Sequence, residues 1–287
     1  MTASGDHVDG GQPSQQQLQD MVDWLLPLAR AAGRQIMTIY EEACGHPDGR
    51  HSALVQRKSD NSPLTAADLA AHRTIEAGLE AHSAGLPVIS EESFAPGQMA
   101  QAGARFWLVD PLDGTKEFLS GTGEFTVNVA LINDRRPVLG VVYQPSTDEL
   151  FWGGAGFGAW CELGHQARQP IAVAPRTEAP WRVLASRSHL GPHTHILIKR
   201  IGQSELIKAG SSLKFCRIAA GLADFYPRLG YTSQWDTAAA QAVLEGAGGY
   251  VFDTKGRRLQ YGQSEIINPH FLASALPFEA VRHWWNL

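Results

Sequence analysis

The order of its apolar segments limits the folds that this chain can adopt. Short apolar runs bounded by turn residues follow one another at residues 86–90, 106–109, 125–132, 138–143 and 149–152. Runs of this length predict strands, and the turns between them predict an antiparallel meander. After about residue 180, strand-like runs alternate with segments of helical periodicity, which favours an α/β second half. Two amphipathic helices are expected before the meander, one from residue 16 and one after Thr65.

Length and composition indicate one large or two closely packed domains. The chain has 287 residues, of which 44% are apolar, enough to bury a large core. We expect a polar tail over residues 1–15, an N-terminal half over residues 16–178 and a C-terminal half over residues 179–287. A net charge of −5 without a Lys/Arg cluster argues against nucleic acid as a partner.

Cellular location is predicted from what the sequence lacks. The N-terminus has no signal-peptide pattern, and no apolar run reaches the roughly 18 to 20 residues that span a bilayer. The cysteines lie too far apart in sequence for a disulfide framework or a CxxC metal site, which favours a reducing compartment. These cysteines are Cys44, Cys161 and Cys216. The prediction is therefore a cytoplasmic protein without a transmembrane segment.

Acidic side chains at the ends of predicted elements are the strongest chemical signal. The apolar run at 106–109 leads directly into Asp110 and Asp113, and Pro111 and Gly114 favour a turn there. Such a turn would place both carboxylates and the Leu112 carbonyl on one side of a loop, and oxygen ligands at short range suit Mg²⁺. Taken alone, the segment favours an exposed turn, because these residue types dominate turns of every kind.

Further acidic residues follow or open other predicted elements: Asp68, Glu91, Glu92 and Asp236. Each of them could singly be a favourable charge at a helix start or part of a solvated loop. Ligand-binding residues gather at the ends of elements in α/β folds, so together they predict one metal site.

Four ordered motifs resemble the lithium-sensitive, magnesium-dependent phosphatases, a family that includes inositol monophosphatase and the bisphosphate nucleotidases. The motifs are KSDNSPLTAAD at residues 58–68, SEES at 90–93, DPLDGTKEF at 110–118 and WDTA at 235–238. Within the family, the chain is most similar to 3'(2'),5'-bisphosphate nucleotidases of the CysQ type. This similarity rests on SRSH at residues 186–189, GSSLKF at 210–215, YPR at 226–228 and WDT at 235–237. The resemblance implies a layered α-β-α-β-α sandwich with the metal site between its halves.

The resemblance also implies roles for individual residues. Two or three Mg²⁺ ions would be bound by Glu91, Asp110, Asp113 and Asp236 through side chains and by Leu112 through its carbonyl. Asp68 and Thr115 would form a hydrogen-bonded pair that orients and deprotonates the attacking water, and Glu91 would join them as a catalytic residue. The substrate would contact Glu91, Leu112, Asp113, Gly114, Thr115 and Asp236.

A second phosphate on the substrate needs fixed cations or hydroxyl donors, for which Lys214, Arg228 and Ser211 or Ser212 are the candidates. Two structural alternatives stay open: Lys214 could be an ordinary exposed helix residue, and Arg228 could simply pair with Asp224.

The function that the resemblance implies is Mg²⁺-dependent hydrolysis of 3'-phosphoadenosine 5'-phosphate to AMP and phosphate, with inhibition by lithium. Within enzymes, the alternative is an inositol monophosphatase or a broader sugar phosphatase. From another class, the alternative is a metal- or nucleotide-binding regulator without turnover. A monomer or homodimer is expected, and some relatives associate peripherally with the inner membrane, although this sequence shows no anchor.

Overall fold

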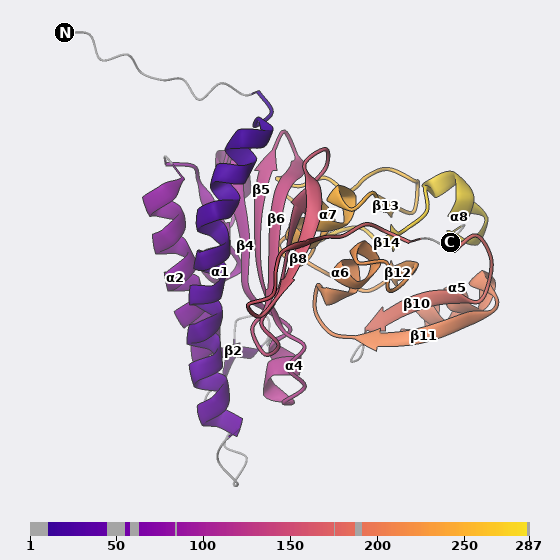
Figure 1. The fold of residues 1–287 in the computed structure, drawn as a ribbon, viewed down its shortest axis with the longest axis horizontal. Coiled ribbons are helices and arrows are strands. Elements are labelled where there is room, and N and C mark those ends of the chain that lie inside the picture. Colours follow the sequence, from indigo (N-terminus) through magenta and orange to yellow (C-terminus); the bar gives the residue numbers. More distant parts are fainter. Residues whose placement is uncertain are drawn as a thin grey trace.

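Five layers make up the fold, in which helices alternate with two sheets (Figure 1). The computed structural model describes residues 11–44, 55–57, 63–83, 85–174, 176–186 and 191–285. Helices α1 (Gln15–Cys44) and α2 (Ala66–His82) cover one face of a seven-stranded sheet. Helices α6 (Leu213–Ala219) and α7 (Ala238–Gly246) lie between this sheet and a five-stranded one. Helices α5 (Pro192–Ile201) and α8 (Phe278–Trp285) cover the far face of the second sheet. The predicted α-β-α-β-α sandwich is thereby confirmed.

The seven-stranded sheet is the predicted meander, extended at one end. Its strands, in spatial order, are β3 (Val88–Ser90), β4 (Arg105–Asp113), β5 (Thr126–Asn133), β6 (Arg136–Gln144), β7 (Glu149–Gly154), β8 (Gly158–Leu163) and β9 (Gln169–Pro170). β3 pairs with β4 in parallel, and every later neighbour is antiparallel. Because β3 and β4 are parallel, the residues that follow or end them lie at the same edge of the sheet.

The five-stranded sheet contains the predicted alternation of strands and helices. Its strands, in spatial order, are β11 (Ser204–Ala209), β10 (Trp181–Ser186), β12 (Phe225–Arg228), β14 (Phe271–Ser274) and β13 (Tyr250–Asp253). β10 is parallel to both of its neighbours, whereas β14 is antiparallel to β12 and β13. Neither β14 nor α8 is among the predicted elements.

Short elements complete the description. They are β1 (Val55–Arg57), β2 (Pro63–Thr65), η2 (Glu91–Ser93), α3 (Gln98–Gln101) and α4 (Thr115–Leu119). Some predicted features lie outside the described residues: most of the tail, residues 58–62 of the first motif and residues 187–189 of the SRSH run.

Helix α7 joins the two sheets. Its residues from Ala238 to Leu244 are all buried, as expected for a helix with sheets on both sides. It packs closely on β6, where a methyl group at Gly140 would collide with the Ala239 carbonyl oxygen. This contact places Asp236, which precedes α7, beside the first sheet.

Candidate active site

Three carboxylates from three separate segments meet at the end of β4. Oxygen atoms of Glu91, Asp110 and Asp236 all lie within 4.8 Å of one another. Glu91 follows β3, Asp110 belongs to β4, and Asp236 comes from the loop before α7. The turn predicted after residue 109 is instead a continuation of β4 to Asp113. A bulge interrupts the pairing of β4 with β5 between Asp110 and Asp113, and such a bulge redirects the side chains that it carries.

Asp110 lies in an environment that disfavours its ionised form. It is 1% exposed; its Oδ1 accepts a hydrogen bond from the Leu112 amide at 3.0 Å, while its buried Oδ2 has no hydrogen-bond partner among the described residues. Burial first, and then the charges of Glu91, Asp113 and Asp236, raise its pKa well above 3.8. An unpartnered carboxylate oxygen beside two further carboxylates is a donor set that fits a hard divalent cation.

Asp236 and Asp113, two further members of the predicted carboxylate set, differ in their contacts. Burial, followed by the charges of Asp113 and Glu91, raises the pKa of Asp236 well above 3.8, although the Ser233 amide donates to its Oδ2 at 2.9 Å. Asp113 is not part of the close trio. Its Oδ2 accepts from the Ser211 hydroxyl and the Ser212 amide, both at 2.7 Å, and Lys214 partly opposes the rise in its pKa that burial causes.

Asp68 is held by the predicted capping box at the start of α2. The hydroxyl and the amide of Thr65 donate to Asp68 Oδ2 at 2.5 and 2.7 Å. Burial raises the pKa of Asp68 to about 6, with smaller contributions from Glu92 and Glu91. The predicted hydrogen bond between Asp68 and Thr115 does not occur in the described part of the chain; the hydroxyl that Asp68 accepts from is that of Thr65, through Oδ2.

A cavity of about 230 Å³ opens beside the carboxylates. Most of the predicted site residues line it: Glu91, Asp113, Gly114, Thr115, Ser212, Lys214, Arg228 and Asp236. Asp68, Asp110 and Leu112 are buried behind this lining. Gly114 has φ of 96° and precedes the first residue of α4, so its left-handed backbone turns the chain from β4 into the helix.

Lys214 is buried, which excludes the alternative of an ordinary exposed helix residue. It is 4% exposed, its Nζ donates to the carbonyls of Ala209, at 3.3 Å, and Ser211, and it lies 5.0 Å from the centre of the Tyr226 ring. Burial lowers its pKa to about 8, and Asp113 partly offsets this effect. The cavity therefore has carboxylates and a buried amine in its lining.

Ser212 and Arg228 differ in how far they are already engaged. The Ser212 hydroxyl donates to Asn128 Oδ1 at 2.8 Å and lies 2.9 Å from the Thr126 hydroxyl, so it is anchored to β5. Arg228 Nη2 donates to the Tyr231 carbonyl at 3.0 Å, and its buried Nε has no partner among the described residues. Thr126 and Asn128 were not predicted, since their contacts with Ser212 depend on strand register.

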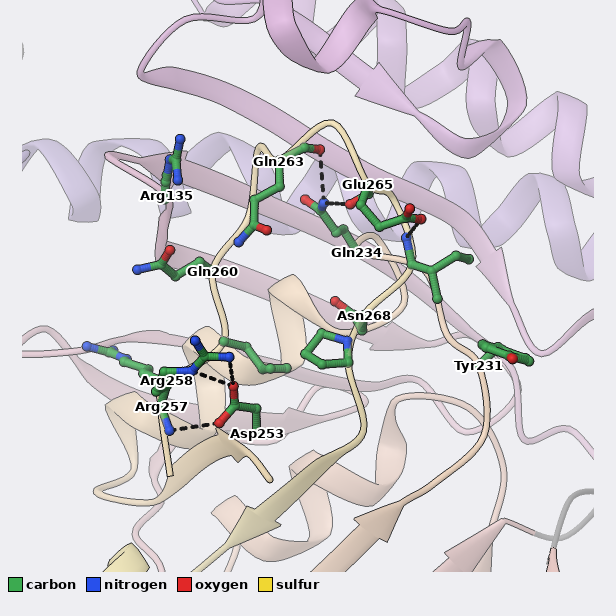
Figure 2. Close-up of a pocket in the computed structure, with 13 residues that line it drawn as sticks. Arg135, Tyr231, Gln234, Asp253, Arg257, Arg258, Gln260, Gln263, Glu265 and Asn268 are labelled. Carbon is green, nitrogen blue, oxygen red and sulfur yellow. Dashed lines mark hydrogen bonds and ion pairs between the residues drawn. The ribbon is translucent and has the colours of Figure 1, made fainter. Parts of the chain in front are cut away.

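A larger cavity of about 830 Å³ is lined by Tyr231 and Gln234, from the loop before α7, and by residues between 253 and 269 (Figure 2). Arg257 pairs with Asp253 beside it, and none of the predicted site residues lines it. Gln234 and Asn268, whose side chains lie between the loops in Figure 2, belong to its lining.

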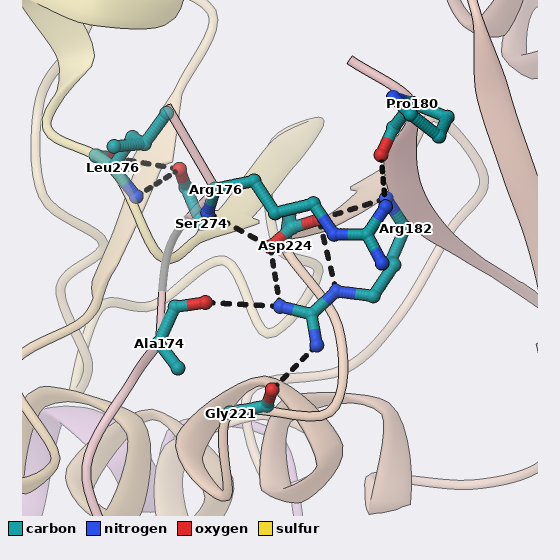
Figure 3. Close-up of polar contacts among 8 residues, drawn as sticks. All are labelled: Ala174, Arg176, Pro180, Arg182, Gly221, Asp224, Ser274 and Leu276. Carbon is teal, nitrogen blue, oxygen red and sulfur yellow. Dashed lines mark hydrogen bonds and ion pairs between the residues drawn. The ribbon is translucent and has the colours of Figure 1, made fainter. Parts of the chain in front are cut away.

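Asp224 pairs with Arg182. It does not pair with Arg228, as the structural alternative for Arg228 had proposed. Arg182 forms a two-pronged ion pair with it, in which Nε lies 3.1 Å from Oδ2 and Nη2 lies 2.7 Å from Oδ1 (Figure 3). The Arg182 amide donates to the same carboxylate at 2.8 Å. Arg228 is therefore not needed to neutralise Asp224, and it remains at the cavity.

Comparison with known proteins agrees with the motifs. Residues 17–283 match the inositol monophosphatase family. Over 255 residues the chain is 43% identical to the 3'(2'),5'-bisphosphate nucleotidase CysQ of Escherichia coli strain K12, a match that covers 88% of this chain and 99% of the relative. A relative of the same name from Aggregatibacter actinomycetemcomitans is 32% identical over 275 residues, which cover 93% of this chain and 96% of the relative.

Solved structures share the fold. The crystal structure of CysQ from Bacteroides thetaiotaomicron has a TM-score of 0.76 and 36% identity, and the match covers 91% of this chain and 97% of that one. A Thermotoga maritima IMPase has a TM-score of 0.73 and 23% identity, with 93% and 97% covered. None of the helices in the described ranges is long and apolar enough to cross a membrane. The family that the motifs predicted is confirmed: the chain belongs to the inositol monophosphatase family.

Proposed function

We propose that this chain is a magnesium-dependent 3'(2'),5'-bisphosphate nucleotidase that hydrolyses 3'-phosphoadenosine 5'-phosphate to AMP and phosphate. The observation that carries the proposal is the cavity of about 230 Å³, which has the carboxylates and the buried Lys214 in its lining. A substrate with two phosphates matches such a site, since one phosphate can share a cation with the carboxylates while the other meets a fixed positive charge. The name of the similar relatives, 3'(2'),5'-bisphosphate nucleotidase CysQ, supports this assignment.

The proposed ligands for two or three Mg²⁺ ions are Glu91, Asp110, Asp113, Asp236 and the Leu112 carbonyl. The unpartnered Oδ2 of Asp110 and its proximity to Glu91 and Asp236 support this choice. When bound, Mg²⁺ ions lower the pKa of water and neutralise charge on the phosphoryl group and the leaving oxygen. Asp113 is held by Ser211 and Ser212, so its second oxygen, Oδ1, can face the cation without loss of either hydrogen bond.

Asp68 and Thr115 are proposed to orient and deprotonate the attacking water. Both hydrogen bonds from Thr65 end on Asp68 Oδ2, so Oδ1 remains as an acceptor for Thr115 or water. A pKa of about 6 suits a proton acceptor that works near neutral pH. The amides of Gly114 and Thr115 are proposed to donate to a phosphate oxygen, which is supported by the place of both residues in the cavity lining at the start of α4.

Lys214 distinguishes the proposed substrate from an inositol monophosphate. Burying an ammonium group is costly unless charged partners compensate it, and burial lowers the pKa of Lys214 even though the charges of Asp113, Glu117 and Glu124 act against this effect. A second phosphate supplies the missing charge. Lys214 and Arg228 are therefore the proposed ligands of the phosphate that is not hydrolysed.

The test is phosphate release by the purified chain from 3'-phosphoadenosine 5'-phosphate and from inositol 1-phosphate, each with Mg²⁺, with EDTA and with added lithium. We expect Mg²⁺-dependent, lithium-sensitive release from the nucleotide and little from the inositol ester. Equal or faster release from the inositol ester would contradict the assignment of Lys214. No release from either substrate, together with tight nucleotide binding, would favour the regulator instead. Asp68→Asn should abolish release and leave nucleotide binding in place.

A further inference from the structure

Asp236 is the one member of the carboxylate trio that comes from the C-terminal half of the chain, and its position relative to Glu91 and Asp110 depends on long-range contacts. It lies in an irregular loop between β12 and α7. Within this loop its carboxylate accepts a hydrogen bond from the Ser233 amide at 2.9 Å. An irregular segment keeps a fixed geometry only if neighbouring groups hold its backbone.

Asn268 holds the loop on both sides of Asp236. Its buried amide nitrogen Nδ2 lies 2.6 Å from the Ser233 carbonyl, 3.1 Å from Thr232 Oγ1 and 3.0 Å from Thr237 Oγ1. Its backbone amide donates to the Thr232 carbonyl at 2.8 Å. Asn268 thus binds the carbonyl of Ser233, the residue whose amide donates to the Asp236 carboxylate, and also contacts the residue that follows Asp236.

Gln234 makes the reciprocal connection. Its Nε2 donates to the carbonyls of Glu265 at 2.7 Å and Gln263 at 3.3 Å (Figure 2). Its Oε1 accepts from the Gly262 amide at 2.7 Å. Its backbone amide donates to the Ile266 carbonyl at 2.9 Å. Gln234 and Asn268 therefore cross-link two segments that lie about 30 residues apart in sequence, and we call the pair the amide brace.

We propose that the amide brace positions Asp236 for cation binding, an inference that rests on the proposed function. Gln234 and Asn268 touch neither cation nor substrate in this proposal, so they are positioning residues. They act by fixing the backbone of residues 232–237, which sets the distance from Asp236 to the two carboxylates of the first sheet. Groups that orient metal ligands typically change metal affinity or activity by about 10–100-fold when they are removed.

The test measures cation binding directly, by titration with Mn²⁺ and detection of the free ion by electron paramagnetic resonance. We expect Asn268→Ala and Gln234→Leu each to weaken Mn²⁺ binding at least about ten-fold. In activity assays, the Mg²⁺ concentration for half-maximal rate should rise, with most of kcat recovered at saturating Mg²⁺. Gln260→Ala is the matched control, since this exposed residue lines the same cavity as the brace but makes no hydrogen bond with the described residues.

The outcomes separate this inference from the proposed function. If the native chain binds Mn²⁺ and both brace variants bind it equally well, the inference is wrong and the proposed metal site stands. A lowered Tm with unchanged Mn²⁺ affinity would likewise reduce the brace to a purely structural contact. If the native chain binds no Mn²⁺ at all, the proposed metal site fails and the inference fails with it. Should Asn268→Ala not fold, Gln234→Leu alone decides the question.

Discussion

At the scale of one residue, Asp110 is a proposed metal ligand that destabilises the metal-free fold. Its buried carboxylate adjoins like charges and has one oxygen without a partner. We expect Asp110→Asn to lower phosphate release at least about 100-fold, because a cation contributes several kcal/mol to the transition state and each 1.4 kcal/mol is a factor of ten. The same change should raise the Tm of the metal-free chain, because it removes a repelling charge. Release assays and thermal denaturation in EDTA measure both effects.

A matched control for this substitution is Asp134→Asn. Asp134 is exposed, lies in the turn between β5 and β6, and has φ of 48°, a conformation that Asn tolerates well. We expect no change in activity and little change in Tm. If Asp110→Asn instead lowered the metal-free Tm, the repulsion between the carboxylates would not be the dominant contribution.

Because of the lowered pKa of Lys214, we expect substrate binding to depend on pH. Its pKa of about 8 means that the charged fraction of the amine falls about ten-fold between pH 7 and pH 9. Because the charged form is the one that attracts phosphate, kcat/KM for 3'-phosphoadenosine 5'-phosphate should fall by about the same factor over this range. The pH profile of kcat/KM provides the measurement.

Two comparisons isolate Lys214 in that profile. Adenosine 3'-monophosphate lacks the second phosphate, so its kcat/KM should not show the decline that Lys214 causes. In Lys214→Arg the charge persists to high pH, and the decline for the bisphosphate should disappear. Parallel declines for both substrates would mean that Lys214 does not bind the second phosphate.

At the scale of elements, Arg182 on β10 connects three segments outside its own strand. Besides its pair with Asp224, it donates to the Gly221 carbonyl after α6 at 2.6 Å and to the Ala174 carbonyl before β10 at 2.9 Å (Figure 3). Asp224 is fully buried. Arg182→Met would leave that charge with only the longer contact to Arg176, whose Nε lies 4.0 Å from Asp224 Oδ2, so we expect a loss of about 3–5 kcal/mol in the free energy of unfolding, measured in urea.

The pair between Arg282 and Glu279 provides the control for burial. Both of its side chains are exposed, by 66% and 75%, whereas the Arg182 side chain is 16% exposed and the Asp224 side chain is fully buried. Exposed ion pairs contribute about 0–1 kcal/mol, so Arg282→Met should change the free energy of unfolding by no more than that. Similar losses for the two variants would show that burial of Asp224 is not what makes Arg182 important.

The elements also show how far the sequence alone could lead. The capping box of Thr65 and Asp68 and the strand before Asp110 were predictable, because both depend on residues that are close in sequence. β14 was not predicted, since its four residues form a strand only by pairing with β12 and β13. For the same reason the site residues on β4 were identified and the amide brace was missed: the partners of Asn268 lie more than 30 residues away.

For the whole molecule, the raised carboxylate pKa values imply that folding and cation binding depend on each other through pH. The folded chain holds protons on Asp68, Asp110 and Asp236 more tightly than the unfolded chain does. The stability of the metal-free chain should therefore decrease as the pH rises from about 3.8 through about 6, the ordinary and raised pKa values of Asp68, and the lost stability is not regained at higher pH.

Mg²⁺ should reverse this trend, because it binds the ionised carboxylates of the folded chain and competes with protons. A cation present at 100 times its Kd adds about 2.7 kcal/mol to the free energy of unfolding. We expect the gain in Tm from Mg²⁺, relative to EDTA at equal ionic strength, to be small at pH 5 and large at pH 8. The difference between the two Tm curves also cancels the titration of groups remote from the site. A gain that is the same at both pH values would mean that Mg²⁺ does not bind these carboxylates.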